Sequence, residues 1–460
     1  MCPARSYREA EQRFSARHWV ESIRFSSIEG ELCVKVATVS IHELKNLLTR
    51  LQGLLYNPYP LLITLFSFSF IFFLGRGHYR VFLDSTLLLV LAHLFIRRYF
   101  ISCIRSPHFV VVVITSILLV VNYLTPGTRI DERSVWNIFY FIGIVLGIHF
   151  LSLHLQYHGL RLLGNITVTL LAVLTLAHLF GDLLFPLDCE NQKIDGRHCG
   201  LFSNPHFLAM FASLAIPLLV YFAKFSQGQF RVLTLTLLFG NSYLLLITGS
   251  RSAWLALLAG NLSAIILFAR ANRRWWSILG VCVLAAIVYF EGIEGANLRV
   301  DKLIKHFSDE DRLIIWADSW RMLLNNSLPE WLLGHGIDSF GYYFGKYSHL
   351  KVTKGFVVGD FTFPHNFLME LLFDNGITGL ILIIVGYVAY FLTIIRYHNI
   401  CKVDSTRFLI AVFFTLSIIH LIHTFLTLPF YAKPAILPLG LIMGVSLAVG
   451  EHWVDEHANS

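Results

Sequence analysis

Long apolar stretches separated by short polar connections dominate the pattern of this chain. A helix needs about 20 apolar residues to cross the hydrocarbon core of a bilayer, and shorter runs must recruit their polar flanks. Twelve candidate runs occur, at 60–75, 81–96, 108–124, 135–155, 165–180, 206–223, 232–249, 252–269, 277–292, 376–395, 408–428 and 434–449. The pattern therefore predicts an all-α, polytopic membrane helix bundle with about 12 transmembrane helices.

Composition supports the same class and excludes several others. Of the 460 residues, 56% are hydrophobic and only 14% are charged, and the mean hydropathy is +0.64. A soluble domain of this size needs far more polar surface. The net charge of +7 is not gathered in a basic stripe, so we expect no nucleic-acid partner and assign the excess to cytoplasmic loops. The first apolar run begins near Pro60, too far along for a cleaved signal peptide.

The polar segments divide the chain into five parts and suggest its orientation. The parts are a cytoplasmic or interfacial N-terminal region (1–58), transmembrane helices 1–9 (59–292), a periplasmic loop with short helices (293–365), transmembrane helices 10–12 (366–450) and a cytoplasmic tail (451–460). With the N-terminus inside, the inner connections carry twelve basic residues and the outer ones eight. This bias favours both termini in the cytoplasm, with the loop outside.

The 293–365 loop is the only sizeable polar piece between two spans. Its stretch DRLIIWADSWRMLL (311–324) has an amphipathic pattern that predicts a helix, followed by a break at Pro329 and the glycine-rich turn LLGHGIDSFGYYF. Seventy-odd residues are marginal for an independent core. We therefore expect the loop to lie over the bundle and cap a cavity.

His365 stands where this loop meets a new apolar run. Pro364 favours a break before it, and the sequence after Asn366 favours a helix that begins there. A helix N-terminus disfavours a positive charge, so the imidazole would stay neutral and could act as a general base. The alternative is an interfacial histidine that merely hydrogen-bonds the loop.

Two arginines are candidates for binding phosphate. Arg251 lies between two apolar runs beside Gly249 and Ser250, which let backbone and hydroxyl groups approach an oxyanion, whereas snorkelling to the interface is the plainer explanation. Arg312 lies in SDEDRLIIWADSW, where a surface pair with Asp309 is the plainer explanation.

Four further residues could support these groups. Ser250 is adjacent to Arg251. Asn366 directly follows His365, and Glu370 and Asp374 share one predicted helix face with Asn366 at four-residue steps. The carboxylates could orient His365 or hold a substrate hydroxyl, or they could be solvated residues of the outer face. The sequence contains no nucleotide-binding glycine loop and no paired-carboxylate metal pattern.

Two of the seven cysteines share one short polar loop, DCENQKIDGRHC. If this loop faces an oxidising periplasm, a disulfide between Cys189 and Cys199 would close it; two free thiols are the alternative. A single cysteine pair lacks the second pair that a zinc site of this kind requires.

The combined motifs resemble the O-antigen ligase and O-antigen polymerase superfamily of bacterial membrane glycosyltransferases. The signature is His365-Asn366, nine residues, Gly376, two residues and Gly379. Three earlier stretches also resemble that family in the same order, at 200–218, 247–260 and 311–340. His335 departs from the pattern, because it occupies a turn position where an apolar residue is more usual.

The resemblance implies a function. The donor would be an undecaprenyl-diphosphate-linked glycan, and a ligase would move the glycan onto the lipid A–core saccharide at the periplasmic face of the inner membrane of a Gram-negative bacterium. The reaction would invert the anomeric centre without a metal or another cofactor. His365 would be the catalytic base, and Arg251 and Arg312 would hold the diphosphate, as guanidinium groups can replace the charge of Mg²⁺.

Two alternatives remain. A polymerase of the same superfamily would extend one lipid-linked glycan with another by nearly the same chemistry, and the complete histidine signature favours the ligase. A transporter is a different class, but the spans show no pair of matching broken segments, and ionisable residues within them are sparse. Asp84 is an exception with no obvious partner.

Overall fold

The apolar runs form helices throughout the part of the chain that the structure describes. The computed structural model describes residues 63–64, 80–97, 106–124, 131–154, 157–180, 198–202, 204–268, 311–349 and 363–458, which all belong to one unit. Every regular element in these ranges is a helix. The predicted all-α class is confirmed there.

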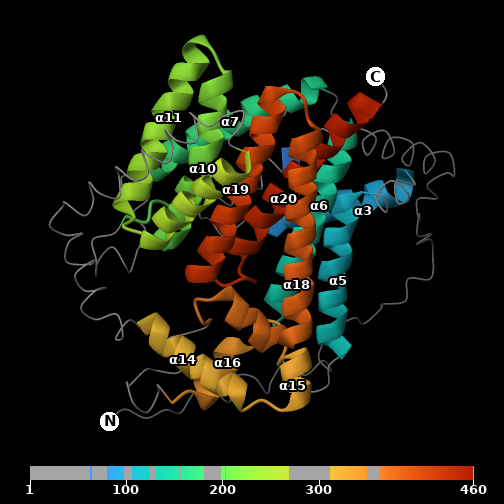
Figure 1. Cartoon of the computed structure of the whole chain (residues 1–460), viewed down its shortest axis with the longest axis vertical. Helices are drawn as coiled ribbons and strands as arrows, with labels where there is room; N and C mark the ends of the chain where they lie inside the picture. Colours follow the sequence, from blue (N-terminus) through green and yellow to red (C-terminus); the bar gives the residue numbers. More distant parts are fainter. Residues whose placement is uncertain are drawn as a thin grey trace, which may run out of the picture. The chain divides into compact units, whose positions relative to one another are not determined.

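Thirteen helices lie in the described ranges (Figure 1). They are α3 (Arg80–Arg97), α5 (Pro107–Leu124), α6 (Glu132–His154), α7 (Tyr157–Leu179), α10 (Pro205–Phe225), α11 (Gly228–Ile247), an unlabelled helix (Arg251–Phe268), α14 (Asp311–Leu324), α15 (Leu328–Leu333), α16 (Phe340–Tyr347), α18 (Phe367–Ile400), α19 (Asp404–Leu426) and α20 (Lys433–Ala458). Ten of the twelve predicted runs coincide with these helices. The run at 277–292, nearly all of the run at 60–75 and the N-terminal region lie outside the described residues.

Seven of the described helices are long and apolar enough to cross a membrane. The apolar stretches of α5 (Pro107–Tyr123) and α7 (Asn165–Leu179) are shorter than these seven. The length and composition of these helices indicate an integral membrane protein, and the total of 12 spans stays a prediction.

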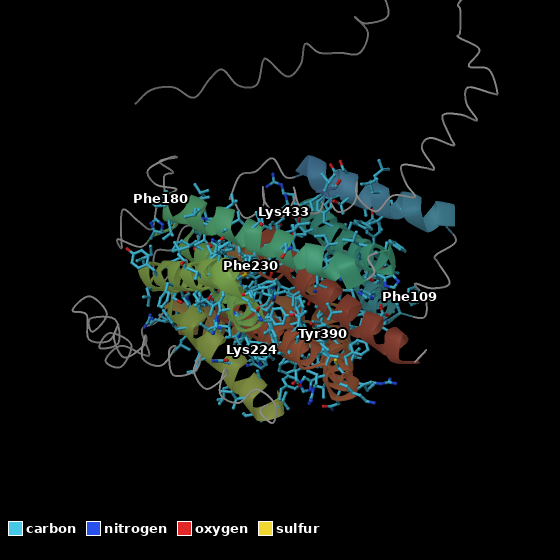
Figure 2. All side chains as sticks on the ribbon, turned by 90° about the horizontal axis from the view of Figure 1, so that it is seen from above. Phe109, Phe180, Lys224, Phe230, Tyr390 and Lys433 are labelled. Carbon is cyan, nitrogen blue, oxygen red and sulfur yellow. The ribbon has the colours of Figure 1, made fainter. Side chains whose placement is uncertain are left out.

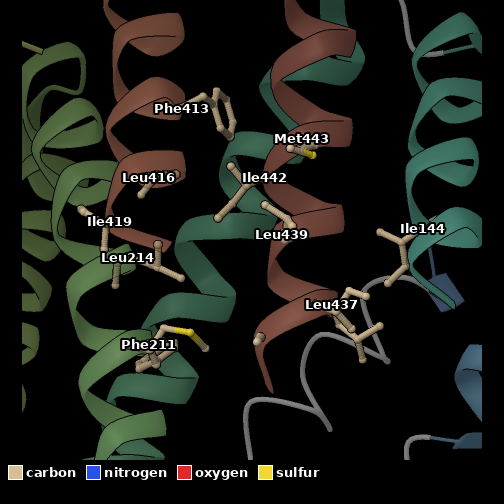
Figure 3. Packing of buried hydrophobic residues seen from close by; sticks show 14 of the residues in the cluster. Ile144, Phe211, Leu214, Phe413, Leu416, Ile419, Leu437, Leu439, Ile442 and Met443 are labelled. Carbon is tan, nitrogen blue, oxygen red and sulfur yellow. The ribbon is translucent and has the colours of Figure 1, made fainter. Parts of the chain in front are cut away.

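The most extensive helix contact joins α6 and α20. Gly440 and Gly444, four residues apart on α20, let the two backbones approach closely, because a Cβ atom at Gly444 would lie 2.8 Å from Ile148 Cδ1 and one at Gly440 would lie 3.1 Å from Phe141 Cδ2. Small residues at this spacing are typical of helix packing in membranes. Figure 3 shows Ile144 of α6 beside Leu437 and Leu439 of α20.

Helices α10 and α19 extend this core on the other side of α20. Figure 3 shows Phe211 and Leu214 of α10 facing α19, from which Leu416 and Ile419 project. Side chains fill the space between the helices in the perpendicular view (Figure 2). The hydrophobic core is continuous across these helices. Asp84 on α3 also has a partner here, because Tyr140 Oη donates to its carboxylate at 2.7 Å.

The loop helices pack against the first turns of α18. Helix α14 covers residues 311–324, as predicted, and α15 begins at Leu328 with Pro329 in its first turn and a Ser327–Glu330 capping box. Phe373 of α18 completes a small apolar cluster with Ile315, Met322, Leu323, Phe340 and Phe344 of the loop. The described part of the loop therefore shares its core with α18.

Candidate functional site

His365 occupies a strained position immediately before α18. Its φ is +53°, a left-handed conformation that few residues other than glycine adopt, although histidine does so more often than most. Asn366 is the N-cap of α18 and accepts from the backbone amides of Leu368 at 3.1 Å and Met369 at 3.3 Å. The cap bonds of Asn366 thus hold the backbone that directly follows His365 in place. Backbone strain of this kind clusters at functional sites.

One hydrogen bond determines which nitrogen of His365 carries the proton. Nδ1 lies 3.3 Å from the backbone carbonyl oxygen of Thr427. Because a carbonyl oxygen can only accept, Nδ1 must be the donor, and the neutral ring then has its lone pair on Nε2. Burial and the nearby positive charge of Arg312 lower the pKa of His365 to about 4, against the opposing effect of the Thr427 bond. The imidazole is therefore neutral at pH 7, with a free lone pair.

Arg312 reaches this region from α14. Trp316, one turn later on the same helix face, donates its Nε1–H to the Pro364 carbonyl at 2.8 Å. This bond fixes the face of α14 that carries Arg312 against the segment that leads into His365. The effect of the guanidinium on the His365 pKa agrees with this placement.

Arg251 begins the Arg251–Phe268 helix, and its flanking serines connect it to the same region. Its side chain is exposed. Ser250 Oγ lies 3.1 Å from Ser252 Oγ, and Thr427 Oγ1 donates to Ser252 Oγ at 2.7 Å. Thr427 therefore contacts His365 through its carbonyl and the Gly-Ser-Arg turn through its hydroxyl.

Sequence reasoning missed two residues of this arrangement. Thr427 is the C-cap of α19 and lies 62 residues from His365 in the chain. His206, in the first turn of α10, has Nδ1 3.3 Å from Ser250 Oγ. A signal for His206 existed, because it lies within the 200–218 stretch that resembles the family; nothing in the sequence points to Thr427.

The two carboxylates that follow His365 are both buried, so the alternative of solvated outer-face residues is wrong. Asp374 accepts from the amides of Asp338 at 3.0 Å, Ser339 at 3.1 Å and Phe340 at 3.1 Å, and from the Ser339 hydroxyl at 3.0 Å. This set of bonds makes Asp374 the anchor of the loop. Glu370 accepts from the Phe430 amide at 2.8 Å, and its other oxygen has no hydrogen-bond partner among the described residues. Neither carboxylate is hydrogen-bonded to His365.

The structure explains why a glycine occupies position 376 of the histidine signature. Gly376 interrupts α18 with φ +61° and ψ −170°, and an added Cβ atom would lie 2.5 Å from the Leu332 carbonyl carbon. Gly334, at φ +77°, makes the reciprocal approach to the backbone of Asp374. The amides of His335 and Gly336 donate to the carbonyls of Phe373 and Asp374 at 3.0 and 2.8 Å. The Gly-x-Gly turn is thereby attached to the break in α18.

His335, the departure from the family pattern, packs inside this turn. Its ring lies 4.4 Å from Tyr343 and 4.6 Å from Phe373, centroid to centroid, and its Nε2 lies 3.1 Å from Asn326 Oδ1. Burial lowers the pKa of His335 despite the nearby Glu330. It therefore fills the place of an apolar residue as a neutral ring.

Cys199 is disulfide-bonded in the structure. Its neighbour His198 donates its amide to the Ile247 carbonyl at 3.2 Å, two residues before Gly249. Cys189 lies outside the described residues, so its pairing with Cys199 stays a prediction. The disulfide nevertheless lies at the same end of α11 as Ser250 and Arg251.

Part of the chain that contains the candidate site matches one known family. Residues 233–384 match the model of a family described as O-antigen ligase. A search of curated proteins gave no match. The matched region includes Arg251, Arg312 and His365. It supports an O-antigen ligase or polymerase type of function for a bacterial integral membrane protein, and the superfamily resemblance is confirmed over this region.

Proposed function

We propose that this chain, which matches the O-antigen ligase family over residues 233–384, is an O-antigen ligase. It would transfer a glycan from undecaprenyl diphosphate to the lipid A–core oligosaccharide at the periplasmic face of the inner membrane. The observation that carries this proposal is the neutral His365, whose Nδ1–H is donated to Thr427, whose Nε2 is left as an acceptor and whose pKa is lowered in part by the charge of Arg312.

His365 would activate the acceptor. A sugar hydroxyl of the core saccharide attacks the anomeric carbon, and its proton passes to Nε2 of His365 as the new C–O bond forms. The Thr427 carbonyl holds the ring in the required tautomer and stabilises the positive charge that develops on it. Attack on the face opposite the leaving group inverts the anomeric centre.

Arg251 and Arg312 would stabilise the leaving group. The bond between the anomeric carbon and the diphosphate oxygen breaks with its electron pair, so a negative charge grows on the lipid diphosphate. Guanidinium groups make bidentate, charge-assisted hydrogen bonds to phosphate. Removing one such donor from a preorganised site typically costs about 10²–10³ in rate.

The periplasmic orientation rests on two observations. The basic-residue bias of the loops favours it. The disulfide at Cys199 lies near the Gly249–Arg251 turn, and disulfides persist in the periplasm. A cysteine introduced at Leu328, which is 71% exposed on the loop, should react with a membrane-impermeant maleimide on spheroplasts, relative to the parent protein. Protection at this position in a folded protein contradicts the orientation.

The purified protein in nanodiscs, given lipid-diphosphate glycan and a rough core acceptor, tests the reaction itself. We expect transfer without ATP and without added Mg²⁺. A deletion strain should accumulate full-length lipid-linked glycan. Accumulation of single-repeat intermediates would instead assign the chain to the polymerases.

A further inference from the structure

Two histidines and a glutamate converge far from His365. His108 lies at the start of α5, His149 near the end of α6 and Glu451 in the C-terminal part of α20. Their potential ligand atoms all lie within 4.8 Å of one another. Ser134, at the other end of α6, donates to Asp338 of the loop at 2.6 Å. The 15 residues from Ser134 to His149 span about 22 Å of helix, so this cluster is separate from the candidate active site.

A neutral His108 would turn a lone pair toward the carboxylate of Glu451. It is fully buried, and its Nε2 lies 3.1 Å from the Gly444 carbonyl oxygen. Because the carbonyl must accept, Nε2 carries the proton, and the lone pair of the neutral ring is on Nδ1. Nδ1 lies 3.3 Å from Glu451 Oε2 and has no hydrogen-bond partner among the described residues. Two acceptors thus lie against each other.

His149 faces the same carboxylate oxygen. Its side chain is 2% exposed, and its Nδ1 lies 3.4 Å from Glu451 Oε2. Neither ring nitrogen forms a hydrogen bond within the described part of the chain. Buried polar atoms of a folded protein normally have partners. The ring centroids of the two histidines lie 4.6 Å apart, and the potential ligand atoms of all three side chains lie within 4.8 Å of one another.

Two of the three separations between ligand atoms fit a metal ion. A tetrahedral ion with ligand bonds of about 2.1 Å separates its ligand atoms by about 3.4 Å. The two observed nitrogen–oxygen separations are 3.3 and 3.4 Å. Imidazole and carboxylate ligands suit Zn²⁺ and related ions, whereas Mg²⁺ prefers oxygen ligands. The bond from His108 Nε2 to Gly444 is the outer hydrogen bond that usually orients a metal-binding histidine.

We propose that His108, His149 and Glu451 bind a divalent transition-metal ion of the Zn²⁺ class through Nδ1, Nδ1 and Oε2. Glu451 is 21% exposed, which leaves an entry route and room for water as the fourth ligand. The ion would join α5, α6 and α20 next to Gly444, whose missing side chain lets α20 lie close to Ile148 of α6. Its role is structural, and it is independent of the transfer reaction proposed above.

A shared proton is the competing explanation. In that arrangement an imidazolium at His108 and the Nδ1–H of a neutral His149 would both donate to Glu451, which leaves Nε2 of His149 without a partner among the described residues. A divalent ion would instead be bound by both Nδ1 lone pairs and by Oε2 at once. The two explanations differ in metal content, which can be measured without any enzymatic assay.

The experiment uses the full chain, purified in detergent, loaded with Zn²⁺ and desalted. Elemental analysis should give stoichiometric zinc for the wild type. His108→Gln and His149→Gln should each lower the Zn²⁺ affinity at least about tenfold, because even the loss of a residue that only hydrogen-bonds a ligand typically has an effect of that size. His398→Gln is the matched control, because His398 is also buried but packs on Phe268 at 4.2 Å, and it should retain zinc.

A second measurement covers the case in which the histidine variants do not fold. Glu451→Gln changes a partly exposed side chain while keeping its size. Added Zn²⁺ should raise the thermal unfolding temperature of the wild type and leave that of Glu451→Gln unchanged. Equal zinc in the wild type and Glu451→Gln after desalting, or equal thermal shifts, would overturn the proposal.

Discussion

The carbonyl oxygen of Thr427 lies 3.3 Å from Nδ1 of His365 and accepts its proton in a hydrogen bond. This relationship leaves Nε2 as the atom that can take a proton from a substrate. The Thr427 hydroxyl meanwhile donates to Ser252, beside Arg251. One residue at the end of α19 thus positions the proposed base relative to one proposed phosphate-binding arginine.

Replacing His365 by glutamine should abolish transfer while leaving donor binding intact. A glutamine amide can hydrogen-bond a hydroxyl but cannot accept its proton, and general-base catalysis contributes about 10²–10⁴-fold. The measurement is turnover of the purified variant beside equilibrium binding of the lipid-diphosphate donor. Near-normal turnover with weakened donor binding would instead indicate a histidine that only orders the loop.

The pH profile should reflect the low pKa of His365. The base must be unprotonated, so kcat/KM is retained above the folded-state pKa of about 4 and declines as the pH falls through it. Arg312→Gln removes one cause of the lowered pKa, so its acidic limb should move to higher pH while burial still opposes a full return. An unchanged limb in this variant would separate Arg312 from His365.

Transfer activity should require Arg251 and Arg312 but not Mg²⁺. Arg251→Ala and Arg312→Ala should each lower kcat/KM by about 10²-fold or more, and lysine should restore part of this because it lacks the bidentate fork. Arg321→Ala provides the control on the same helix as Arg312, because Arg321 is paired with Asp318 at 2.7 Å. A loss of activity that only added Mg²⁺ repairs would contradict the role of the arginines.

Gly376→Ala should detach the loop from α18. The backbone has φ +61°, and the new Cβ atom would collide with the backbone of Leu332, so the variant should lose about 1–3 kcal/mol of stability or more. Gly386→Ala on the same helix is the control, because its Cβ atom would meet only the end of the Ile114 side chain, at 3.3 Å. Thermal unfolding in detergent, with protease sensitivity of the loop, measures the difference. Equal stability of the two variants would refute this attachment.

The sequence alone determined the class of the protein and the positions of most helices. Apolar runs of membrane length identify membrane helices directly, because a helix in lipid must form its own backbone hydrogen bonds and present apolar side chains. Helix α14 was predicted at its observed bounds, since its amphipathic period is local information. The signature His365-Asn366…Gly376…Gly379 also indicated the family that the comparison supports.

Only the tertiary structure decided which partners these residues meet. Thr427, His206 and the approach of Gly334 to Asp374 join segments distant in the chain, and no spacing rule reports such contacts. Asp374 shared its predicted helix face with Asn366, yet it anchors the loop backbone instead of orienting His365. His108, His149 and Glu451 carry no recognisable spacing, because three separate helices bring them together. Periodicity encodes which face of a helix is buried, whereas the neighbour on that face depends on how the helices pack.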